Sequence, residues 1–102
     1  MSSSSSTSES SESLSSGGNI LVDGIDLIPD CSGSYCLKGT CSDKPIYQRL
    51  DDKFMICWKE TFGRWELIEF ATAQYWFRND VDIVGEFSPH CDVKGNPIIS
   101  EK

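Results

Sequence analysis

The chain has 102 residues and a formal net charge of −7, and its nine lysines and arginines form no run. A nucleic-acid-binding surface needs clustered positive charge against the phosphates, so nucleic acid is not an expected partner. A membrane is not expected either, because no apolar run is long enough to span a bilayer and no basic cluster would bind anionic lipid.

The first 18 residues contain 11 serines and very little that is apolar. Such a segment cannot bury enough apolar surface to offset the entropy lost on ordering it. We therefore expect residues 1–18 to be a disordered, acidic tail and residues 19–102 to be one small β-domain. That second part holds all 11 aromatic side chains, which are large enough to fill a small core.

Short segments between closely spaced turn residues follow the tail. Segments 33–37 and 45–50 are predicted to be outer strands, and Pro45 suits the start or the edge of a strand. Segments 53–58 and 64–70 are predicted to pair as a hairpin, with 74–77 and 82–87 as shorter strands after them. For 71–77 a helical turn is the alternative, because its alanines and glutamine permit one.

The strongest single segment is 53–58. In a strand, Phe54, Ile56 and Trp58 would share one face, while Met55 and Cys57 would share the other. Both faces are apolar, which is typical of a central strand covered on both sides. The predicted fold class is all-β, a small antiparallel meander that closes into a compact sandwich or a half-open barrel.

Glycine and aromatic motifs are spaced along this meander: Gly33-x-Tyr35, Gly39, Pro45-x-Tyr47, Phe54-x-Ile56-x-Trp58, Gly63-x-Trp65-x-Leu67, Tyr75-Trp76 and Gly85-x-Phe87. With these motifs the chain resembles, over roughly residues 31–99, an uncharacterised β-module of multidomain proteins from unicellular algae and other protists. The resemblance implies a meander of short strands and no known activity.

Five cysteines lie in the predicted domain, and an odd number leaves at least one thiol unpaired. If Lys38 and Gly39 formed a two-residue turn, Cys36 would face Cys41 at the distance of a disulfide. The alternative is that both are ordinary thiols in a reducing compartment. Oxidised cysteines would favour an extracellular location, and reduced cysteines a cytoplasmic one.

A cysteine-based site, redox or structural zinc, is the alternative function. Four residues separate Cys31 from Cys36 and Cys36 from Cys41, a spacing at the edge of the range for structural zinc sites, and a second pair of ligands is missing. Small apolar side chains are the simpler interpretation, so we expect no cofactor. The residues concerned are Cys31, Cys36, Cys41, His90 and Cys91.

No catalytic constellation is evident, so the chain is not expected to be an enzyme. A cysteine nucleophile needs a base within hydrogen-bond reach, and His90 is the only histidine. In an extended chain its neighbour Cys91 would point to the opposite face.

The preferred hypothesis is a non-catalytic binding module for a protein or a carbohydrate. Three consecutive aromatics, 75–77, cannot all face one core, so at least one must point outward. An exposed ring beside an arginine would mark a contact surface, whereas the alternative is a second layer of core. The residues predicted to form this surface patch are Trp65, Tyr75, Trp76 and Arg78.

Overall fold

The computed structural model describes residues 18–102, and every regular element in that range is a β-strand. Except for Gly18, the predicted tail lies outside the described residues. Within residues 18–102, no helix has the length and apolarity to cross a membrane. The strands are β1 (Ile20–Asp23), β2 (Gly33–Cys41), β3 (Lys44–Arg49), β4 (Phe54–Lys59), β5 (Arg64–Glu69), β6 (Tyr75–Arg78), β7 (Gly85–Glu86), β8 (Ser88–Pro89) and β9 (Ile98–Glu101).

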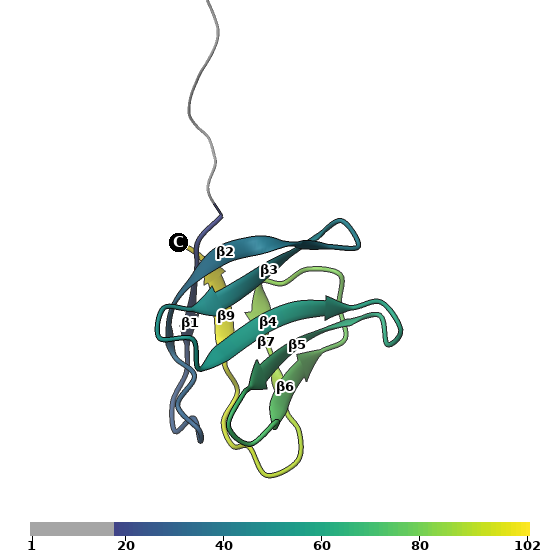
Figure 1. Ribbon diagram of the computed structural model, residues 1–102. Helices are drawn as coiled ribbons and strands as arrows, with labels where there is room; N and C mark the ends of the chain where they lie inside the picture. The colour runs from purple at the N-terminus through teal and green to yellow at the C-terminus, as the bar shows by residue number, and fades with distance from the viewer. Residues whose placement is uncertain (1–17) are drawn as a thin grey trace, which may run out of the picture.

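These strands form one antiparallel sheet in the order β7-β9-β1-β2-β3-β4-β5-β6-β8. Strands β7 and β8 stand at the two ends of this order, yet only Phe87 separates them in the chain. Because β7 pairs with β9 and β8 pairs with β6, segment 85–89 brings the two ends of the sheet together. The sheet curls into a nearly closed barrel (Figure 1), which confirms the predicted all-β class and selects the barrel over the sandwich.

The predicted central hairpin is present as β4 and β5. Its register runs from Phe54 paired with Glu69 at one end to Lys59 paired with Arg64 at the other, and it places Trp58 opposite Trp65. Ile56 and Phe54 point into the barrel and are buried, as the alternation predicts. Strand β4 lies in the interior of the strand order, with β3 on one side and β5 on the other.

Large side chains fill the barrel, and their polar tips bind backbone groups. The indole Nε1 of Trp65 donates a hydrogen bond to the carbonyl oxygen of Val81 at 3.0 Å, and that of Trp76 donates to Gly95 at 3.1 Å. Both rings therefore fasten an irregular loop to the core, and their N–H groups are satisfied although buried. The core consists of Ile20, Val22, Leu27, Cys31, Tyr35, Tyr47, Phe54, Ile56, Trp65, Leu67, Trp76, Phe87, Val93 and Ile99.

Strands β1, β8 and β9 were not predicted, and one predicted strand is shorter than expected. Strands β1 and β9 have four residues each, among turn-forming residues, so their pattern is too short to be distinctive. The strand predicted at 82–87 is reduced to β7, because an irregular loop precedes it. No helical turn replaces β6: the carboxylate of Glu69 instead accepts a hydrogen bond from the backbone N–H of Thr72 at 2.7 Å, and this turn leads into β6.

Candidate functional site

Two of the four residues predicted to form a surface patch belong to the core. Trp65 is 2% exposed, and Trp76 is fully buried. The prediction is wrong for both residues because a barrel of this size needs the apolar area of its largest rings inside. In the run 75–77, Trp76 is the ring that faces the core.

Arg78, the third predicted residue, is engaged within the fold. Its Nε donates a hydrogen bond to the carbonyl oxygen of Asp82, its Nη1 donates to that of Glu86, both at 3.1 Å, and its Nη2 lies 3.5 Å from the carboxylate of Asp80. The guanidinium lies so close to Gly85 that a Cβ there would clash with it. Arg78 thus pins the loop between β6 and β7, a structural role in place of the predicted recognition role.

Tyr75, the fourth predicted residue, lies on the outer face of the barrel. It alternates with the buried Trp76, so Phe77 shares its face, and both rings are half-buried. Arg64 of β5 packs against both of them. We call this outer surface of β5, β6 and the adjoining loops the aromatic patch, and define it as Phe62, Arg64, Tyr75, Phe77 and His90.

Arg64 organises the aromatic patch. Its guanidinium carbon lies 4.7 Å from the ring centre of Phe62, 4.8 Å from that of Phe77 and 5.8 Å from that of Tyr75. A 3.0 Å ion pair with the buried carboxylate of Glu66 holds it there. These distances are within the range of cation–π attraction, so the arginine is held in one orientation against three rings.

His90 joins the aromatic patch through strand pairing. Because β8 pairs with β6 through Ser88 and Pro89, the next residue is carried beside Tyr75. The rings of Tyr75 and His90 stack with their centres 4.4 Å apart, and the Phe77 ring forms a T-shaped pair with the imidazole, with 5.7 Å between ring centres. The imidazole is therefore held by rings on two sides.

The structure brings Cys91 and His90 together, which the sequence argument did not expect. Cys91 has a φ of 59°, in the left-handed region, so the chain is not extended there. Its Sγ lies 2.9 Å from Nδ1 of His90 instead of on the opposite face. The other ring nitrogen, Nε2, is 3.2 Å from the hydroxyl of Tyr75. A thiol, an imidazole and a phenol thus form one chain of contacts.

Sequence reasoning reached this surface only in part. Of the residues in the aromatic patch, the predicted surface patch contained Tyr75 and left out Phe62, Arg64, Phe77 and His90. Tyr75 and Phe77 follow from the alternation of β6 once Trp76 is known to be buried. His90 depends on the pairing of β6 with β8, a two-residue strand that no local pattern indicates.

The predicted Cys36–Cys41 bridge rests on a turn that the chain does not make there. Strand β2 continues through Lys38 and Gly39 with a bulge, and the chain reverses at Ser42 and Asp43. Both cysteines therefore lie on one strand, about 15 Å apart at the usual rise per residue, which is too far for a disulfide. All five cysteines are free thiols.

The alternative metal set is not assembled either. Within residues 18–102, no group of three or more His, Cys, Asp or Glu side chains could hold a metal ion. Cys31 is fully buried in the core, where loss of solvation raises the pKa of its thiol to about 12. Burial also raises the pKa of the Cys57 thiol. Neither residue is a ready thiolate at neutral pH.

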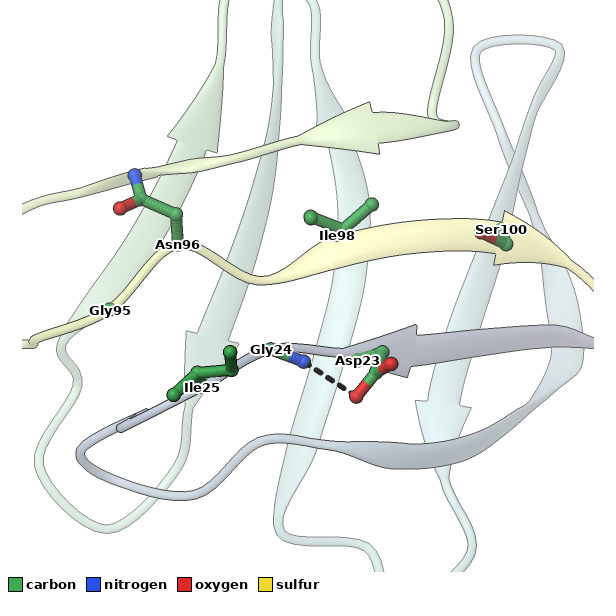
Figure 2. A pocket seen from close by; sticks show the side chains of 7 residues that line it. All are labelled: Asp23, Gly24, Ile25, Gly95, Asn96, Ile98 and Ser100. Carbon is green, nitrogen blue, oxygen red and sulfur yellow. Dashed lines mark hydrogen bonds between the residues drawn. The ribbon is translucent and has the colours of Figure 1, made fainter.

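A hollow of about 430 Å³ lies on another wall of the barrel, along β1 and β9 (Figure 2). Two of its polar side chains are engaged: the Asp23 carboxylate accepts a hydrogen bond from the N–H of Gly24 at 2.8 Å, and the Asn96 amide donates to the carbonyl of Phe87. It holds a single titratable side chain and offers no acid–base pair. The residues that line it are Asp23, Gly24, Ile25, Gly95, Asn96, Ile98 and Ser100.

Comparison with known proteins leaves the functional argument to this geometry. The chain matches no protein-family model, no curated protein and no solved structure at a significant level. The resemblance to a protist β-module stays a prediction.

Proposed function

We propose that this protein is a non-catalytic binding module that contacts a partner protein through the aromatic patch. The observation that carries the proposal is the guanidinium of Arg64, held within 6 Å of the ring centres of Phe62, Tyr75 and Phe77 on the outer face of the barrel. Aromatic side chains and arginine are the residues that dominate binding energy at protein interfaces.

Preorganisation supports this role. Arg64 is held by Glu66 and by the rings around it, and the imidazole of His90 is held by Tyr75 and Phe77. Side chains that are already ordered lose little conformational entropy when a partner binds. Phe62 is 61% exposed, so its ring offers apolar area that a partner would remove from water.

The charges around the aromatic patch indicate the chemistry of the partner. Lys59 lies opposite Arg64 in the β4–β5 hairpin. Within the described residues, Lys59 forms no ion pair. Lys59 is a positive group at the edge of the aromatic patch, on a chain whose net charge is −7. We therefore propose a partner surface with an apolar centre and an acidic rim, which would meet Lys59.

Photo-crosslinking followed by affinity measurement tests the proposal. A photoreactive phenylalanine analogue at Phe62 of the full chain should give a discrete adduct with one partner protein, and the same analogue at Leu50 should not. Leu50 is the matched control because it is 68% exposed but lies in the turn between β3 and β4. With the purified partner, Phe77→Ala should weaken binding at least about tenfold, as expected for a central interface aromatic.

Other results would overturn this assignment. Equal affinity of Phe77→Ala and Leu50→Ala would show that the aromatic patch is not the interface. Binding to purified oligosaccharides that Phe77→Ala abolishes would replace the protein partner with a carbohydrate. Concentration-dependent dimerisation that the same variant abolishes would replace it with a second copy of the chain.

A further inference from the structure

We propose that Cys91 and His90 form a nucleophilic thiol site that exchanges stoichiometrically with a low-molecular-weight disulfide. Of the five thiols, Cys41 and Cys91 are exposed, and Cys31 and Cys57 are buried. The sulfur of Cys91 lies 2.9 Å from Nδ1 of His90, which is the single histidine of the chain. A thiol next to a base, with the base positioned by a third group, is the arrangement that activates a nucleophile.

Tyr75 sets the orientation of the base. Its hydroxyl oxygen can accept two hydrogen bonds, from Nη2 of Arg64 at 3.4 Å and from Nε2 of His90 at 3.2 Å. The proposed reaction uses the tautomer with the proton on Nε2, in which the imidazole presents the lone pair of Nδ1 to the Sγ of Cys91. Tyr75 is therefore a positioning residue, and its stacked ring holds the imidazole in plane.

The backbone conformation of Cys91 brings its sulfur to the imidazole of the preceding residue. The left-handed φ of 59° is uncommon for a cysteine and turns its side chain back toward its own neighbour. Strained backbone of this kind occurs where a side chain must be aimed, and here it aims the sulfur at the imidazole. An extended chain would separate the two side chains.

The reaction is a thiol–disulfide exchange in which atoms and electrons balance. His90 Nδ1 accepts the proton of the Cys91 thiol, and the sulfur attacks one sulfur of the disulfide. A new S–S bond forms between Cys91 and that sulfur while the old S–S bond breaks. The leaving thiolate takes the proton from the imidazolium, so the products are a mixed disulfide on Cys91 and one free small thiol.

Cys41 supplies the matched control, since it is equally an exposed thiol and has no histidine contact. The folded full chain would be treated with oxidised glutathione, and the adduct at each cysteine would be followed by mass spectrometry of peptides. We expect Cys91 to react about tenfold or more faster than Cys41, within the range of general-base assistance. His90→Asn keeps a polar group near the sulfur but removes the base, so it should reduce the rate at Cys91 to that at Cys41.

Tyr75→Phe separates positioning from packing. It keeps the stacked ring and removes the hydroxyl, so the Cys91 rate should fall to a value between those of the unmodified chain and His90→Asn. Equal rates at Cys91 and Cys41, or an unchanged Cys91 rate in a folded His90→Asn variant, would overturn the proposal. Circular dichroism of each variant verifies folding, and because no partner protein is present, failure here leaves the proposed binding function standing.

Discussion

Arg78 and Gly85 show how a single contact decides the role of a residue. The arginine that sequence reasoning assigned to a binding surface is surrounded by acceptors from its own loop. Gly85 has a φ of 139°, a conformation that side chains other than glycine rarely adopt, and it leaves the space that the guanidinium occupies. The position of the Arg78 guanidinium therefore depends on the absence of a side chain at Gly85.

We expect Gly85→Ala to destabilise the protein by about 3 kcal/mol, through backbone strain and displacement of the Arg78 guanidinium from its acceptors. Gly63→Ala is the matched control, since Gly63 also has a left-handed φ but no atom lies within 4 Å of the position that an added methyl group would take. It should cost about 1 kcal/mol. Urea denaturation measures both values.

A double-mutant cycle separates the two causes. In an Arg78→Ala background the guanidinium is gone, so Gly85→Ala should lose about half of its effect and retain only the backbone strain. Additive effects of the two substitutions would contradict the proposed contact.

Strand pairing, one level up, decides which residues share a surface. Alternation along β6 puts Tyr75 and Phe77 outside and Trp76 inside, and that much follows from the sequence once one ring is known to be buried. The position of His90 follows instead from the pairing of β6 with β8. Local alternation thus places Tyr75 and Phe77 in the aromatic patch, and strand pairing places His90 there.

The β2–β3 hairpin shows the same division. Its chain reversal lies at Ser42 and Asp43, both with left-handed φ values of 54° and 63°, as a two-residue turn of this hand requires. Lys38 and Gly39, which also look like a turn in sequence, lie within β2 at a bulge. The disulfide prediction failed because it depended on choosing between two similar turn signals.

Substitutions at the two positions distinguish these turns. We expect Asp43→Val to destabilise the protein by about 1–2 kcal/mol, because a β-branched residue is strained at a left-handed φ. Gly39→Ala should change stability by less than about 0.5 kcal/mol, since Gly39 has no close neighbour and no left-handed φ. Thermal or urea midpoints measure both, and a costly Gly39→Ala with a neutral Asp43→Val would place the turn at Gly39 instead.

Closure of the barrel connects residues that are far apart in the chain. Phe87 is fully buried, its N–H donates to the carbonyl oxygen of Pro97 at 2.8 Å, and its own carbonyl accepts from Asn96. Phe87 thereby holds the junction between β7, which pairs with β9, and β8, which pairs with β6. The same closure seals Cys31 inside, with its carbonyl accepting a hydrogen bond from the hydroxyl of Tyr35.

Sealing Cys31 and Tyr35 inside makes the stability of the whole molecule sensitive to alkaline pH. Burial raises the pKa of Cys31 from 9.0 to about 12, and it also raises the pKa of Tyr35. Below pH 9 the folded and unfolded chains both keep the thiol protonated, so stability does not depend on this group. Between pH 9 and 12 only the unfolded chain ionises, so the free energy of unfolding falls as pH rises, by at most about 1.4 kcal/mol per pH unit from Cys31.

Urea midpoints measured between pH 8 and about pH 11 test this linkage. Cys31→Ala should flatten the decline, whereas Cys41→Ala, which removes an exposed thiol, should leave it unchanged. A decline of the same steepness in the Cys31→Ala variant would show that Cys31 is not its source.

The sequence by itself determined the strand class, the central β4–β5 hairpin and the fact that consecutive rings of β6 point to opposite faces. These follow from alternation and turn residues within a few positions of one another, where backbone geometry leaves few choices. Only the tertiary structure decided that Trp65 and Trp76 are buried, that Arg78 is enclosed by its own loop, and that His90 meets both Tyr75 and Cys91. Those outcomes depend on which distant strands pair and on how the barrel closes, and local periodicity carries no information about either.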